Sequence, residues 1–127
     1  MGAILVVDDE KAIRDLLSMV LTSAGHRVLT AGNGAEAVAV YRSYPDQIDL
    51  VVTDLDMPTM DGAQEILRIR MTNPDARFIC MTGGSADPCP AGVTLLKKPF
   101  AMDQLLAHVQ ELLRPLPRRG GKSARVA

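Results

Sequence analysis

The 127-residue sequence predicts an α/β fold: a doubly wound, open, parallel five-stranded sheet with helices on both faces. Short, continuous apolar runs typical of strands covered on both faces alternate with segments whose apolar residues recur at helical spacing. Glycine, proline or aspartate separates these segments, as expected at element ends. The expected strands are residues 3–7, 26–31, 48–53, 76–81 and 93–96.

Four helices are expected between and after these strands. The first begins at Lys11, places Leu17 and Leu21 on one face, and ends before Gly25. The expected helices are residues 11–24, 35–44, 63–72 and about 101–114. Residues 83–92 contain three glycines and two prolines, so the helix that the alternation requires there is expected to be shortened or missing.

Composition predicts one globular domain over residues 1–114 and a basic, disordered tail over residues 115–127. The chain is 47% hydrophobic and 23% charged, which is ordinary for a globular protein. The tail carries four of the 14 basic side chains and none of the 15 acidic ones, so the rest of the chain is acidic. An acidic domain disfavours binding to nucleic acid phosphates, and we expect no DNA-binding domain.

The sequence also bears on location. No apolar stretch approaches the roughly 18 residues that a membrane span needs, and we expect no membrane association. The N-terminus reaches Asp8 and Asp9 after one short apolar run, which is unlike a secretory signal. A cytoplasmic location is therefore expected, with Cys80 as a core residue rather than a disulfide partner.

Polar side chains of complementary chemistry end four of the expected strands. Asp8 and Asp9 follow the first, Asp54 the third, Thr82 the fourth, and Lys98 comes just after the fifth. Ligands bind at the carboxyl ends of strands in open parallel sheets, so these residues are expected to meet. Three carboxylates repel one another unless a cation lies among them. An oxygen-only donor set favours Mg²⁺ over Zn²⁺, with Mn²⁺ as a possible substitute.

This arrangement suits phosphoryl transfer to a carboxylate. Positioning and charge neutralisation dominate the catalysis of that reaction. Asp54 is the expected nucleophile, and Mg²⁺ and Lys98 would neutralise the transferring group. The Thr82 hydroxyl or neighbouring backbone N–H groups would donate to the remaining oxygens of that group.

Four segments in this order resemble the receiver domains of two-component response regulators. They are Val7–Glu10, Thr53–Gly62, Met81–Gly83 and Lys97–Phe100, and the resemblance extends over about residues 2–113. It implies a flavodoxin-like fold and a Mg²⁺-dependent phosphoryl acceptor at Asp54. The donor would be the phosphohistidine of a sensor histidine kinase or a histidine phosphotransfer protein.

The resemblance also implies roles for the other residues. Asp9, Asp54 and the backbone carbonyl of Asp56 would bind Mg²⁺, and Asp8 would act largely through a metal-bound water. Thr82 would be the switch hydroxyl, and Lys98 would link the acids to the phosphoryl group. Such a protein phosphorylates itself and slowly dephosphorylates itself, and it is not a turnover enzyme.

The sequence departs from the family pattern in two places. Relatives often have an aromatic side chain three residues before the lysine, where this chain has Leu95. The stretch between Thr82 and Lys98 is short and rich in glycine and proline, so the surface that relatives use for docking is expected to differ. With no second domain expected after Leu113, a stand-alone receiver would act by binding another protein or by passing on its phosphoryl group.

Two other functions compete with a phosphorylated receiver. Asp54-Leu55-Asp56 also resembles the nucleophile motif of haloacid-dehalogenase-type phosphatases, although those enzymes place their second acidic pair after the lysine. Here Asp8 and Asp9 come first, and the chain is short for such an enzyme. The third possibility is a protein-binding module of the same fold that works without phosphorylation.

Overall fold

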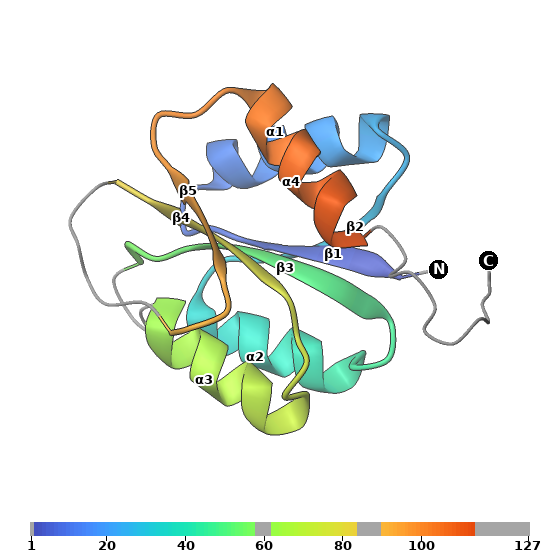
Figure 1. Ribbon diagram of the computed structural model, residues 1–127. Coiled ribbons are helices and arrows are strands. Elements are labelled where there is room, and N and C mark those ends of the chain that lie inside the picture. The colour runs from blue at the N-terminus through green and yellow to red at the C-terminus, as the bar shows by residue number, and fades with distance from the viewer. Residues whose placement is uncertain (1, 58–61, 84–89, 114–127) are drawn as a thin grey trace, which may run out of the picture.

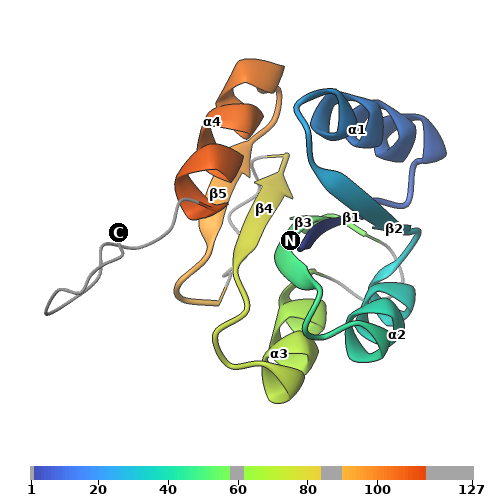
Figure 2. The same ribbon diagram turned by 90° about the vertical axis from the view of Figure 1, so that its right-hand side faces the viewer.

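The computed structural model describes residues 2–57, 62–83 and 90–113. Five parallel strands form one sheet in the order β2-β1-β3-β4-β5. Helices α1 and α4 cover one face, and α2 and α3 cover the other (Figures 1 and 2). The elements are β1 (Ala3–Val7), α1 (Lys11–Ser23), β2 (Arg27–Ala31), α2 (Gly34–Ser43), β3 (Ile48–Asp54), α3 (Gly62–Thr72), β4 (Phe78–Thr82), β5 (Thr94–Lys97) and α4 (Met102–Leu113). The predicted doubly wound fold is confirmed.

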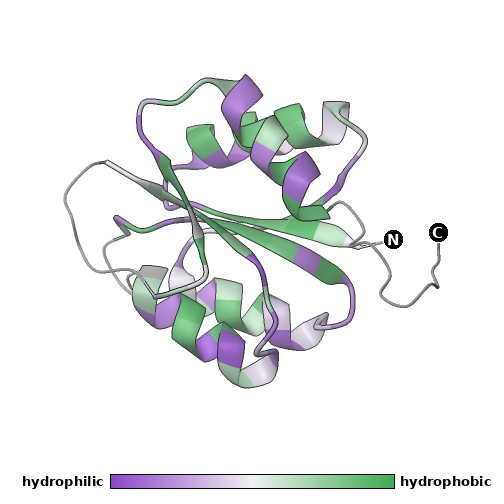
Figure 3. Ribbon diagram, in the orientation of Figure 1, coloured by the Kyte–Doolittle hydropathy of each residue, from purple (hydrophilic) through white to green (hydrophobic). Residues whose placement is uncertain are grey.

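The sheet separates two apolar clusters. Successive side chains of a strand point to opposite faces, so each central strand contributes to both clusters. Leu5 and Val51 lie in the cluster under α2 and α3, whereas Ile4 and Val52 lie in the cluster under α1 and α4. Every residue of β1 is buried. Figure 3 shows the central strands coloured mostly hydrophobic between helices of mixed character, which explains why the strands read as continuous apolar runs.

Most expected boundaries differ from the observed ones by one or two residues. Strand β4 begins at Phe78 rather than at residue 76, because the Ala76 amide donates to the Asn73 carbonyl in a turn. Strand β3 extends to Asp54, and β5 runs over Thr94–Lys97 rather than over residues 93–96. The expected stop at Gly25 is supported by its φ of +98°, which favours glycine.

The connection between β4 and β5 is described only in part. Residues 90–93, which the structure describes, contain no helix. The rest of the predicted irregular stretch, residues 84–89, lies outside the described residues, as does the predicted tail at 115–127. Among the described helices, none has the length and apolar character to cross a membrane.

Candidate functional site

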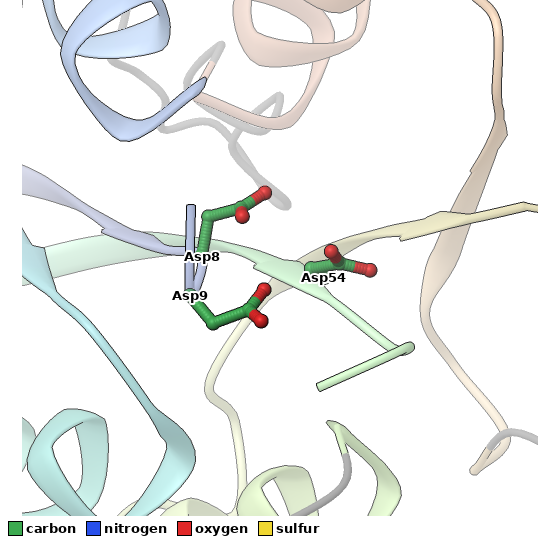
Figure 4. A group of neighbouring side chains, drawn as sticks. All are labelled: Asp8, Asp9 and Asp54. Carbon is green, nitrogen blue, oxygen red and sulfur yellow. The ribbon is translucent and has the colours of Figure 1, made fainter. Parts of the chain in front are cut away.

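Three carboxylates converge at the carboxyl ends of β1 and β3. Val7 pairs with Thr53 in the sheet, so the residues that follow them, Asp8 and Asp54, come out side by side. One oxygen each of Asp8, Asp9 and Asp54 lies within 4.8 Å of the others. Figure 4 shows these three neighbouring side chains at the ends of β1 and β3. Asp8 is 1% exposed and Asp54 is 3% exposed, whereas Asp9 is exposed to solvent.

Local hydrogen bonds orient the two buried carboxylates. Asp8 Oδ1 accepts from the Glu10 amide at 2.9 Å, and Asp54 Oδ1 accepts from the Asp56 amide at 2.9 Å. Both bonds span two residues, which is the local turn that aspartate favours after a strand. The Arg14 side chain donates through Nη1 to the Asp8 carbonyl at 2.7 Å and so attaches α1 to the end of β1.

Lys98 reaches the acids from the far side of β4. Its Nζ donates to Asp54 Oδ2 at 3.0 Å, and its backbone amide donates to the Thr82 carbonyl at 2.7 Å. Burial alone would lower the pKa of the Lys98 ammonium. The hydrogen bond to Asp54, together with the charges of Asp54, Asp8 and Asp56, outweighs burial and raises that pKa. Lys98 is therefore a cation held against the central carboxylate.

Thr82 and Asp56 lie at the edge of this group. Thr82 is the last residue of β4, is half-buried, and pairs with Lys97 of β5. Asp56 is exposed, and its Oδ2 accepts from the Gly83 amide at 2.8 Å. From the sequence, the Asp56 side chain could either join the backbone carbonyl in the site or stay solvated at its rim; in the structure this exposed carboxylate connects the ends of β3 and β4.

The three acids fit a hard dication. Asp8 Oδ2 is buried and has no hydrogen-bond partner among the described residues, so an acceptor is left open beside Asp9 and Asp54. Burial raises the pKa of Asp8. The Glu10 amide opposes this increase, and the charges of Asp54 and Asp9 add to it. A bound cation would relieve both the open acceptor and the repulsion, and an all-oxygen donor set favours Mg²⁺.

Comparison with known proteins now identifies the family. Residues 4–110 match the response regulator receiver domain. The chain belongs to this family. Its 118-residue match to the sensor kinase CckA of Brucella abortus is 36% identical and covers 88% of this chain but 12% of that protein. The response regulator MprA of Mycolicibacterium vanbaalenii is 38% identical over 87% of this receiver and 50% of its own length.

A solved structure supports the same assignment. The response regulator TrrA of Thermotoga maritima, in complex with Mg²⁺-BeF, has a TM-score of 0.77 and is 36% identical. The match covers 89% of this receiver and all of that chain. The receiver spans half or less of the two curated relatives named above. Receiver domains are generally signalling domains without turnover, in agreement with the sequence-based expectation.

Two buried polar residues behind the acids were not anticipated. Thr53 precedes Asp54 on β3, and its hydroxyl donates to Oε1 of Glu65 on α3 at 2.7 Å. Both residues are 0% exposed. A signal was present in the sequence, because Glu65 directly precedes Ile66 and lies four residues before Ile69, so it falls within the buried stripe of α3.

Proposed function

We propose that this receiver takes a phosphoryl group onto Asp54 in a Mg²⁺-dependent step. The donor is the phosphohistidine of a sensor histidine kinase or of a histidine phosphotransfer protein. The observation that most strongly supports this proposal is the environment of the Asp54 carboxylate. It is almost fully buried, has Lys98 Nζ 3.0 Å from one oxygen, and has two further carboxylates beside it. Membership of the receiver family supports this function over a haloacid-dehalogenase-type phosphatase.

The chemistry needs a carboxylate nucleophile and neutralisation of the phosphoryl oxygens. One Asp54 oxygen attacks phosphorus, and the P–N bond to the donor imidazole breaks. The bonding electrons remain on the imidazole nitrogen, which takes a proton from solvent, and Asp54 becomes an acyl phosphate. In the slow dephosphorylation, water attacks phosphorus, the P–O bond to Asp54 breaks, inorganic phosphate leaves, and the carboxylate is regenerated.

The other residues hold and stabilise the transferring group. Lys98 keeps its ammonium charge, so it donates to a phosphoryl oxygen as the bond to Asp54 forms. The Thr82 hydroxyl at the end of β4 donates to another oxygen. Asp8, Asp9, Asp54 and the Asp56 carbonyl would hold Mg²⁺, which neutralises phosphoryl charge when bound, and Mn²⁺ would substitute for it.

The signal passes on through another protein. Phosphorylation at Asp54 would favour binding of a downstream protein, or the phosphoryl group would move to a further carrier. Leu95 lies at the position where relatives often have an aromatic switch residue, and it is 51% exposed. Because leucine has no aromatic ring, switching here would not depend on turning a ring inward. We place the protein in the cytoplasm, where a kinase can draw phosphoryl groups from ATP.

Incubation with acetyl phosphate and Mg²⁺, followed by intact mass measurement, tests the proposal. We expect one added phosphoryl group on the wild type and none on Asp54→Asn or in the presence of a chelator. Asp15→Asn is the matched control, because Asp15 is an exposed aspartate on α1 whose ion pair with Lys11 lies on the surface. This control should be phosphorylated like the wild type.

Two outcomes would overturn the proposal. Sustained hydrolysis of phosphomonoesters that requires Asp54 would indicate the phosphatase. A folded protein that binds Mg²⁺ but gains no phosphoryl group would indicate the phosphorylation-independent binding module.

A further inference from the structure

Glu65 is a buried acid on the opposite side of β3 from the phosphoacceptor. Asp54 and Thr53 are successive residues of β3, so their side chains point to opposite faces of the sheet. Thr53 points toward α3, where its hydroxyl donates to Glu65 Oε1 at 2.7 Å. Glu65 lies in the first turn of α3, the next element along the chain. This hydrogen bond therefore fastens the start of α3 to the residue that precedes Asp54.

Glu65 has too few partners for an ionised carboxylate. Its side chain is 0% exposed, and Oε2 has no hydrogen-bond partner among the described residues. The ion pairs that the structure describes are Lys11–Asp15 and Lys98–Asp54, and neither involves Glu65. A buried carboxylate with one neutral donor is costly, whereas a protonated carboxyl group accepts the Thr53 bond without that cost.

Among the residues that the structure describes, none forms an ion pair with Glu65. Helix α2, which packs against α3, carries Glu36 and Arg42, and both are exposed. The other buried ionisable side chains described on this face are Cys80 of β4 and Tyr41 of α2, and burial raises the pKa of the Tyr41 hydroxyl. On α3 itself, Arg68 is exposed, and the guanidinium of Arg70 lies 5.5 Å from the centre of the Phe78 ring. At the nearby strand ends, Asp8, Asp9, Asp54 and Asp56 add negative charge. The described cations there are Arg14, which donates to the Asp8 carbonyl, Lys98, which is paired with Asp54, and Lys97, which is exposed at the end of β5.

The hydrogen-bonded pair of Thr53 and Glu65 lies next to the two strands, β1 and β3, that end at Asp8 and Asp54. Thr53 pairs with Val7 of β1 and with Cys80 of β4. It is therefore the residue before Asp54 on β3 and the partner of the residue before Asp8 on β1. An ionised Glu65 would have to draw in water or move toward it, which would pull on Thr53 and separate α3 from β3. Such a shift would change the spacing of the carboxylates at the strand ends.

We propose that neutral Glu65 is a positioning residue for the Asp54 site, and that loss of its proton to solvent reduces phosphoryl acceptance. This inference rests on the proposed function. Burial raises the pKa of Glu65 to about 8, although the Thr53 hydrogen bond opposes that increase, so the proton is lost just above neutral pH. At one pH unit above its pKa, about one molecule in ten retains the proton.

The test compares pH profiles of phosphorylation. Initial rates with acetyl phosphate and Mg²⁺ are measured from about pH 6 to about pH 9 for the wild type and for Glu65→Gln, which resembles the neutral acid but does not titrate. Dividing the wild-type rate by the variant rate cancels the titration of the phosphodonor and of the other site residues. We expect the ratio to be constant below about pH 7 and to fall about tenfold by about pH 9.

Two further variants distinguish the proton from packing. Glu65→Leu cannot ionise, and the wild-type rate divided by its rate should show the same pH dependence. Glu111→Gln changes an exposed glutamate of α4, and the wild-type rate divided by its rate should stay flat. Circular dichroism at each pH shows which samples are folded, and only those samples are compared. A purely structural role of Glu65 would change the stability of the protein without changing the pH dependence of the rate of folded molecules.

The outcomes separate this inference from the proposed function. If all variants are phosphorylated and the wild-type to Glu65→Gln ratio is flat, Glu65 does not position the site, and the phosphoacceptor role of Asp54 stands. If neither the wild type nor any variant gains a phosphoryl group at any pH, the phosphoacceptor proposal fails, and the role of Glu65 fails with it.

Discussion

Replacing Glu65 by glutamine should stabilise this receiver at neutral pH. The pKa of Glu65 is about 8 in the folded protein, against an ordinary value of 4.5. The folded state therefore binds this proton more tightly than the unfolded state, and stability falls as pH rises from about 4.5 through 8. At roughly 1.4 kcal/mol per pH unit, the loss is about 3 kcal/mol by pH 7 and about 5 kcal/mol above pH 9. A loss of this size is a substantial fraction of the stability of a typical domain.

Urea unfolding measures this loss directly. The chain has no tryptophan, so far-UV circular dichroism is the suitable probe. The free energies of unfolding of the wild type and Glu65→Gln should be nearly equal near pH 4 and should diverge to about 3 kcal/mol at pH 7, with the variant more stable. Glu111→Gln should follow the wild type at every pH. If the free energies of unfolding of the wild type and Glu65→Gln differ by the same amount at every pH, Glu65 is not a buried, neutral acid with a raised pKa.

Other predictions concern the site and the core. Asp8→Asn should weaken Mg²⁺ binding about tenfold or more, measured by calorimetry, because it removes one of three carboxylates; unchanged affinity would exclude Asp8 from the metal site. Lys98→Met should slow phosphorylation by acetyl phosphate about a hundredfold while Mg²⁺ still binds, and an unchanged rate would contradict its role. Leu5→Ala should cost about 3 kcal/mol in urea unfolding, since Leu5 is fully buried. Asn33→Ala should cost about 1 kcal/mol, because Asn33 Oδ1 accepts from the Glu36 amide at 2.8 Å; no loss would show that this cap is unimportant.

Much of the fold could be predicted because its signals are local. Residues 3–7 are continuously apolar because β1 is covered on both faces, and the helical spacing in α1 follows from one buried stripe. The predicted ends of the helices and strands were less accurate than the elements themselves. Residue 76 suits a strand, but its amide donates to the Asn73 carbonyl in a turn, and β4 begins only at Phe78.

The acidic site was predictable for a related reason. Parallel strands connected by helices bring their carboxyl ends to one edge, so residues that follow different strands were expected to meet there. The structure brings Asp8, Asp9 and Asp54 within 4.8 Å, and it places Lys98 against Asp54. The roles of these residues remain proposals that the phosphorylation and metal-binding experiments test.

Chain order and apolar periodicity thus specify which segments form strands, which form helices, and which polar residues follow them, because those signals depend on near neighbours. The state of Glu65 depends on groups that are distant in sequence. Folding removes its carboxyl group from water and leaves it the Thr53 hydroxyl, with no ion pair to any described residue. A glutamate on an isolated α3 would ionise freely, and burial under the sheet is what raises its pKa.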